Sequence, residues 1–113
     1  MDLKVRTREF ALRIIRRFVA LPKTREAQVI GNQVLRSGTS VGANYREGTR
    51  ARSRLEYATK LNVGLMELEE TLNWLELLEE AKIFSAGKLV ALKSETSELS
   101  AIFVTLIKKA KKP

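Results

Sequence analysis

The chain has 113 residues, of which 44% are hydrophobic and 30% charged, which suits one folded domain and excludes a disordered chain. It contains no cysteine and no histidine, which excludes disulfides, zinc sites of the Cys/His type and a histidine general base. We therefore expect no metal site and no cofactor. The formal net charge of +8 favours a polyanionic partner such as a nucleic acid, although a basic surface can also serve solubility alone.

Membrane insertion and secretion are not indicated. The longest wholly apolar runs have four residues, whereas a membrane-spanning helix needs about 20. The charged N-terminus is followed by no apolar core of a secretory signal. We expect a cytoplasmic protein without a membrane partner, and the lack of cysteine fits a reducing compartment.

Apolar periodicity predicts four helices in succession along the chain. Their ranges are residues 3–21, 25–45, 54–81 and 86–109. In the first, apolar residues between Phe10 and Phe18 recur at the spacing of one helical face. Pro22 ends this helix, because the residue before a proline leaves the α region. Thr24 is placed to cap the second helix, and Gly48 is placed to stop it.

The third and fourth helices carry the clearest pattern. Leucines of the third alternate spacings of four and three, at Leu61, Leu65, Leu68, Leu72 and Leu75. The fourth helix repeats the alternation from Leu89 onward, and this is the seam of a left-handed bundle. Ser53 and Glu56 form a capping box before the third helix. Ser85 is the candidate cap of the fourth, and the basic tail over residues 108–113 is expected to fray.

The predicted fold is a single all-α domain over residues 1–113. No segment alternates as a half-buried strand does, and no Asn-Gly or Asp-Gly hairpin signal occurs. Short connections between long helices favour antiparallel neighbours. The chain is therefore predicted to be an antiparallel, up-down-up-down four-helix bundle.

The second helix departs from a plain bundle in two ways. Gly31, Gly38 and Gly42 share one face and would let another helix approach closely. A second face carries the polar residues Arg36, Ser40, Asn44 and Glu47. We expect these four to form a structural polar network that fixes register, which stabilises the fold only if every member is bonded. A catalytic role has little support, because no residue is evident that could activate a serine or threonine nucleophile.

The stretch from Leu35 to Gly48, LRSGTSVGANYREG, resembles the signature of the bacterial four-helix bundle proteins called 23S rRNA-intervening-sequence proteins. The similarity extends from about Phe10 to Leu106 and includes Glu56-Tyr57, Lys60-Leu61, Glu70-Thr71 and Trp74-Leu75. One departure is Gly64, where we expect alanine from the resemblance.

This resemblance implies a bundle that assembles into a ring-like homopentamer and associates with ribosomal RNA. No enzymatic activity is established for the family that the chain resembles, so the resemblance gives no reason to expect an enzyme. A related bundle, the accessory variability determinant of diversity-generating retroelements, also resembles a pentameric barrel and binds nucleic acid and a reverse transcriptase. The resemblance therefore leaves open a second function, as an adaptor that docks such a partner.

Two charged stripes of opposite sign lie on different predicted helices. They are Arg6, Arg13 and Arg17 on the first helix and Glu69, Glu76 and Glu80 on the third. Acidic residues near a helix C-terminus oppose the helix dipole, and facing arginines would offset this. We expect the stripes to face each other, within a subunit or between neighbours; the alternative is two separately solvated faces. The predicted oligomer interface comprises Arg13, Arg17, Glu69, Glu76 and Trp74, with the tryptophan as a packing or interface anchor.

Two groups of cations are the candidate nucleic-acid contacts. The first is Arg46, Arg50, Arg52 and Arg54, beside Tyr45, and the second is Lys108, Lys109, Lys111 and Lys112. Arginine forks suit phosphates, and neither group contains base-reading architecture. The sequence thus predicts a non-enzymatic oligomeric protein whose binding to nucleic acid, RNA above all, is sequence-independent and salt-sensitive. The alternative is a basic turn that is only solvated.

Overall fold

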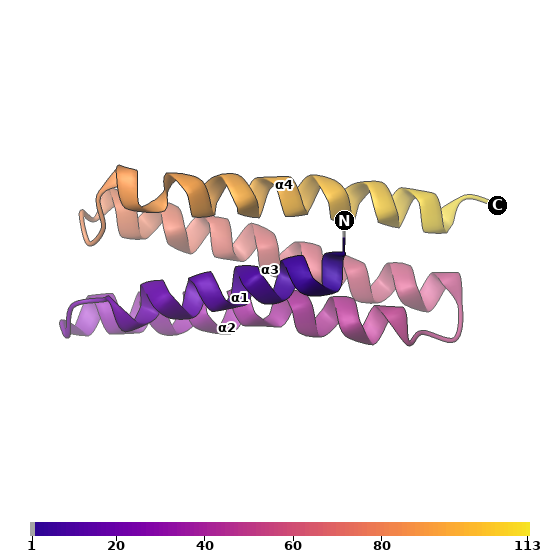
Figure 1. The fold of residues 1–113 in the computed structure, drawn as a ribbon, viewed down its shortest axis with the longest axis horizontal. Coiled ribbons are helices and arrows are strands. Elements are labelled where there is room, and N and C mark those ends of the chain that lie inside the picture. Colours follow the sequence, from indigo (N-terminus) through magenta and orange to yellow (C-terminus); the bar gives the residue numbers. More distant parts are fainter. Residues whose placement is uncertain (1) are drawn as a thin grey trace.

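The computed structural model describes residues 2–113 as four helices joined by short turns (Figure 1). They are α1 (Leu3–Val19), α2 (Arg25–Thr49), α3 (Arg54–Glu80) and α4 (Ala86–Lys111). Successive helices run antiparallel, and the bundle measures 49 × 20 × 19 Å. The predicted all-α four-helix bundle is confirmed, with no strand in the described range. No helix within residues 2–113 has an apolar stretch long enough to cross a membrane.

The helices begin at residues whose side chains satisfy free backbone N–H groups. Asp2 accepts a hydrogen bond from the Lys4 N–H at 2.9 Å. Thr24 and Ser53 cap α2 and α3, as predicted, by accepting from the backbone N–H three residues later. Ser85 precedes α4 but forms no side-chain capping bond. Local sequence thus determines three of the four helix starts.

Helix ends agree less well with the sequence, and two predictions are wrong. α2 does not stop before Gly48 but continues to Thr49, with Gly48 buried inside the helix. A Cβ at Gly48 would lie 2.8 Å from Leu61 Cδ1, so the glycine permits close packing on α3. The basic tail does not fray after residue 109, because α4 continues to Lys111 with Ile107 and Ala110 packed on the core. Smaller differences occur in α1, which ends at residue 19, and in α3, which ends at residue 80.

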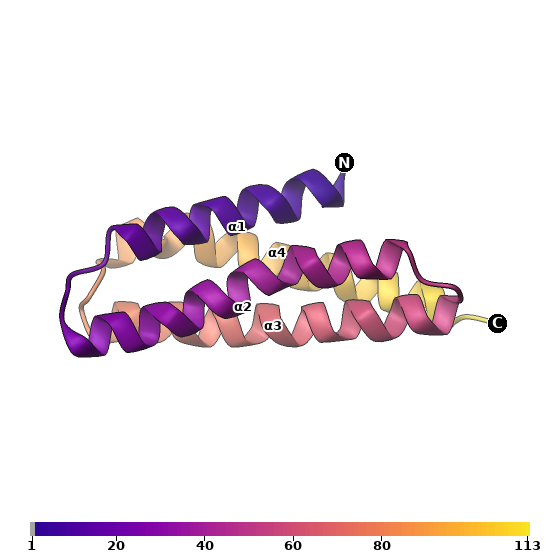
Figure 2. The same ribbon diagram turned by 90° about the horizontal axis from the view of Figure 1, so that it is seen from below.

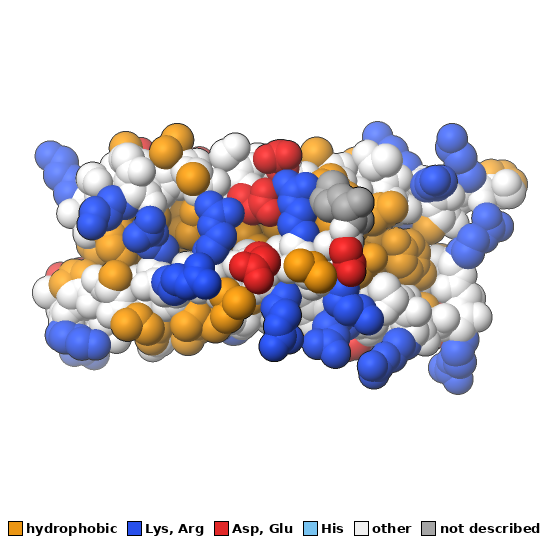
Figure 3. All heavy atoms as spheres, viewed as in Figure 1, with side chains coloured by type: hydrophobic (Ala, Val, Ile, Leu, Met, Phe, Trp, Pro, Cys, Tyr) orange, Lys and Arg blue, Asp and Glu red, His pale blue; other side chains and the backbone are white. Residues whose placement is uncertain are grey.

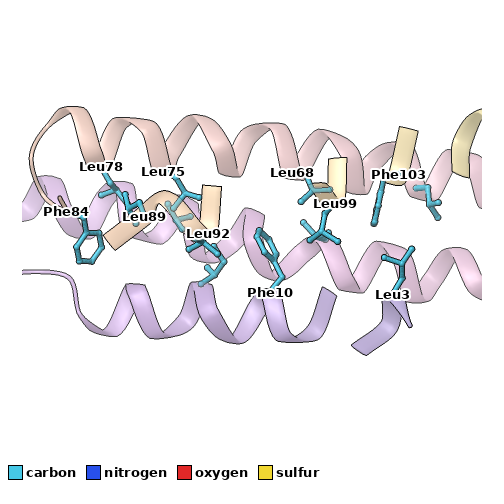
Figure 4. Packing of buried hydrophobic residues seen from close by; sticks show 14 of the residues in the cluster. Leu3, Phe10, Leu68, Leu75, Leu78, Phe84, Leu89, Leu92, Leu99 and Phe103 are labelled. Atoms are coloured by element: carbon cyan, nitrogen blue, oxygen red, sulfur yellow. The ribbon is translucent and has the colours of Figure 1, made fainter. Parts of the chain in front are cut away.

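Buried side chains from all four helices fill one continuous core along the long axis (Figure 4). The predicted seam is largely confirmed: Leu61, Leu68 and Leu75 of α3 are fully buried, whereas Leu65 and Leu72 are partly buried. From α4 the core takes Leu89, Leu92, Thr96, Leu99 and Phe103. α2 packs on both α1 and α3, and α3 packs on α4, but α1 touches α4 at few points and lies diagonally across from α3.

The glycine face of α2 allows the close approach of another helix that the sequence predicts, and the structure shows that this helix is α1. A Cβ at Gly38 would lie 2.7 Å from Ile14 Cγ1, and a Cβ at Gly42 would lie 3.2 Å from Thr7 Oγ1. Ile14 and Thr7 are both buried. These two pairs determine how far α1 extends along α2.

α1 is shorter than its neighbours, and this shapes one end of the bundle. It has 17 residues, whereas the other three helices have 25 to 27. Its N-terminus stops well before the α2–α3 turn (Figure 2). Within residues 2–113, that end of the bundle is therefore formed by α2, α3 and α4.

Gly38→Ala should lower the free energy of unfolding by about 1–3 kcal/mol, because the added methyl would overlap buried Ile14. Alanine's better helix propensity, worth about 1 kcal/mol, would be outweighed. Gly87→Ala is the matched control: nothing lies within 4 Å of its Cβ position, so stability should rise or stay the same. Urea unfolding followed by circular dichroism at one protein concentration measures both. A stabilised Gly38→Ala protein would contradict the close packing.

Candidate nucleic-acid interface

The two predicted groups of cations come together at the three-helix end of the bundle. The α2–α3 turn and the C-terminus of α4 lie at the same end (Figure 1). All eight side chains are exposed: Arg46, Arg50, Arg52, Arg54, Lys108, Lys109, Lys111 and Lys112. A cleft between Arg54 and Leu55 on one side and Lys111 and Lys112, at the C-terminal end of α4, on the other joins the two groups. We call these eight cations the basic end.

Most cations of the basic end have no acidic neighbour. Arg52 lies 3.8 Å from Glu56. Across residues 2–113, the other seven form no ion pair. The Lys60 ammonium donates a hydrogen bond to the Glu47 carboxylate at 2.9 Å, and this bond raises the pKa of Lys60. The basic end is therefore a dense group of positive charges in which only Arg52 has an acidic partner within residues 2–113.

The whole net charge of the protein lies in the half of the bundle that contains the basic end. Residues 2–10, 40–66 and 99–113, the basic half, carry twelve Lys or Arg and four Asp or Glu. Residues 11–39 and 67–98, the neutral half, carry nine of each. Figure 3 shows blue side chains along the whole face that it draws, with the larger red ones near its middle, so the charge difference between the halves rests on the residue counts. Such segregation creates a field that attracts polyanions to one half.

Helix dipoles explain only part of this placement. Lys108, Lys109 and Lys111 lie in the last turn of α4, where the negative end of the dipole stabilises cations. Arg54 is the first residue of α3, where the positive end of the dipole disfavours a cation. Because Arg54 also has no ion-pair partner among the described residues, intramolecular stability does not account for it.

The predicted polar network of Arg36, Ser40, Asn44 and Glu47 is wrong as a mutually bonded set. The Ser40 hydroxyl donates to the Arg36 carbonyl and the Asn44 amide donates to the Ser40 carbonyl. Glu47 accepts from Lys60. On a helix, a short polar side chain reaches the carbonyl of the preceding turn before it reaches a side chain four residues away. The four residues are satisfied separately.

Arg36 instead joins α2 to α3. Its guanidinium donates to Glu67 at 3.3 Å and to Glu70. The hydrogen bond from Arg36 lowers the pKa of Glu70, whereas burial and the neighbouring Glu70 raise the pKa of Glu67. The Trp74 Nε1–H also donates to Glu70 at 3.4 Å. This group orients α2 on α3 and lies away from the basic end.

Sequence reasoning missed a buried hydroxyl pair between the same helices. The oxygens of Ser37 and Thr71 lie 2.8 Å apart, and both side chains are fully buried. Each also bonds a carbonyl of its own helix. The available signal was a polar residue on the apolar stripe of each of two adjacent helices.

The two charged stripes do not face each other within the subunit, because α1 and α3 lie diagonally across the bundle from each other and do not touch. That form of the prediction is wrong. Arg6 pairs with Glu95 of α4, and Arg17 lies over the Phe84 ring at 6.0 Å. Glu69 and Glu76 are exposed. Trp74 is partly buried against the core. Arg13 is partly buried, and its charge contributes to the lowered pKa of Glu95. A contact between stripes of neighbouring subunits stays a prediction.

The Arg6–Glu95 pair is the strongest polar link between α1 and α4. Arg6 donates through Nε and Nη2 to both carboxylate oxygens, at 2.8 and 2.6 Å. This bonding lowers the pKa of Glu95 against the opposing effect of burial. Glu98 lies farther from Arg6, at 3.3 Å, and its side chain is 65% exposed.

Glu95→Gln should lower the free energy of unfolding by roughly 1–2 kcal/mol near pH 7, because it removes a charge-assisted bidentate bond. The pKa of Glu95 is depressed in the folded state, so its stabilisation is present above the carboxyl's ordinary pKa of 4.5 and is lost as the pH falls through the lower folded value. Denaturation at several pH values should show the two proteins converging in acid. Glu98→Gln is the control, with a change below about 0.5 kcal/mol. A pH-independent difference would contradict the assignment.

Comparison with known proteins gives a family and a solved structure. The family described as 23S rRNA-intervening sequence protein matches residues 1–105. A crystal structure of a protein with unknown function from the S23 ribosomal protein family of Bacteroides thetaiotaomicron is similar at a TM-score of 0.89. The two chains are 36% identical, and the alignment covers 95% of this chain and 99% of that one. No curated protein matches the chain.

Proposed function

Because this chain belongs to the 23S rRNA-intervening sequence protein family, we propose that it is a non-enzymatic, homo-oligomeric bundle that binds RNA through its basic half. The observation that carries this proposal is the segregation of charge, with the basic and neutral halves defined above. Seven of the eight cations at the basic end have no ion-pair partner within residues 2–113. Phosphate groups would supply the missing counter-charge, in the cytoplasm where ribosomal RNA occurs.

The geometry favours contact with the phosphate backbone over recognition of bases. Tyr45 packs against Phe103 with ring centroids 6.1 Å apart, and Tyr57 is partly buried on the same core. Burial raises the pKa of the Tyr57 hydroxyl. Neither ring is presented as a stacking platform, so the exposed arginines and lysines carry the interaction. Such contacts bind many sequences and weaken with salt.

Exposed apolar side chains on the outer faces of α1 and α3 support self-association. Leu12, Ile15 and Val19 lie on the outer face of α1, and Met66 and Leu77 lie on the outer face of α3. Exposed apolar side chains that share a helix face suit a protein interface. The family resemblance implies a homopentamer, and a ring would repeat the basic end once per subunit, so that weak contacts to one RNA add by avidity.

RNA binding is tested by reversing charges at the basic end. The double variant Arg50→Glu/Arg54→Glu should bind single-stranded RNA at least tenfold more weakly than the wild type in fluorescence anisotropy. The slope of log affinity against log salt should become shallower by about 1.4, because each phosphate contact contributes about 0.7. The double variant Lys23→Glu/Lys88→Glu is the control. It changes the net charge by the same amount, but in the neutral half, so it should bind RNA as the wild type does.

Wild-type affinity that stays constant from low to high salt would contradict the phosphate mechanism. Undetectable binding would overturn the RNA proposal and favour an adaptor that docks a protein such as a reverse transcriptase. Light scattering on the same samples gives the mass, which we expect to be five times the 12.8 kDa subunit. A monomer would remove the avidity argument.

A further inference from the structure

A groove between α1 and α2 opens beside the basic end. It has a volume of about 480 Å³, and small residues of both helices form its floor, among them Ala11, Gly42 and Ala43. Gly42 keeps the helices close, since a Cβ there would lie 3.2 Å from Thr7 Oγ1. Between the charged side chains, the lining therefore consists of small and largely apolar residues.

Three cations line this groove and none is neutralised by the protein. Lys4 and Arg8 come from α1 and Arg46 comes from α2. All three are exposed, and no acidic residue lines the groove. Within residues 2–113 none of the three forms an ion pair. The site thus offers two walls of positive charge above an apolar floor.

The neutral donors of the groove are already used. The Thr7 hydroxyl donates to the Leu3 carbonyl at 2.7 Å, and the Thr39 hydroxyl donates to the Leu35 carbonyl at 2.7 Å. A ligand would therefore be held by the three cations and by contact with the floor. That combination suits an anionic chain with flat apolar faces and carries no base-specific recognition.

We propose that one strand of RNA continues from the basic end along this groove, with its phosphates against Lys4, Arg8 and Arg46. This rests on the proposed RNA-binding function and extends it to two residues outside the basic end. Arg46 belongs to both sites, so the positive path is continuous. A seam between two packed helices accepts a single strand, whereas a duplex presents a broad convex surface. Sugars and splayed bases would lie on the apolar floor.

The double variant Lys4→Glu/Arg8→Glu tests the path. It should bind a long single-stranded RNA about tenfold more weakly than the wild type, with a salt slope shallower by about 1.4. An oligonucleotide short enough to occupy only the basic end should bind both proteins equally. Lys23→Glu/Lys88→Glu is again the control of equal charge, and Lys4→Gln/Arg8→Gln is a milder variant for use if the first is unstable.

The outcomes separate the two proposals. A wild-type protein that binds RNA and a groove variant that matches the control would overturn the path and leave the basic end in place. No binding by the wild type would overturn both. Loss of assembly in light scattering, with RNA affinity per subunit unchanged, would assign the groove to the acidic face of a second copy and overturn the path.

Discussion

The close approach of α1 to the glycine face of α2 determines where the first helix lies in the bundle. Ile14 packs where Gly38 has no side chain, and Thr7 packs where Gly42 has none. Larger residues at either glycine would move α1 outward or along its neighbour. The pairs therefore determine the position of α1 along α2, and a helix of 17 residues placed there ends before the bundle does.

The distribution of charge follows from that register. Because α1 stops early, the end formed by the α2–α3 turn and α4 is left as three helices with cations on each. The same register places Lys4 and Arg8 across a groove from Arg46. Arg6 then reaches α4 and pairs with Glu95, which leaves the other cations of α1's first turns available to a ligand. Packing in the core thus arranges the surface that we assign to RNA.

Much of this could be predicted from sequence, and the failures have a common cause. Helical periodicity and local caps determine the elements and the buried seam, which is why the bundle and the caps at Thr24 and Ser53 were predicted correctly. Gly48 was misread because its role depends on Leu61 of another helix. The partner of Arg6 was missed because periodicity does not show which helices are diagonal. The groove between α1 and α2 could not be predicted, because it depends on the position of α1 along α2. Only the three-dimensional packing defines that position.

Ultraviolet crosslinking of the protein to single-stranded RNA, followed by mass spectrometry of the crosslinked peptides, tests the division between the halves most directly. Crosslinks should fall within residues 2–10, 40–66 and 99–113. Crosslinks concentrated in residues 11–39 and 67–98 would contradict the view that the segregated positive charge is the RNA-binding surface.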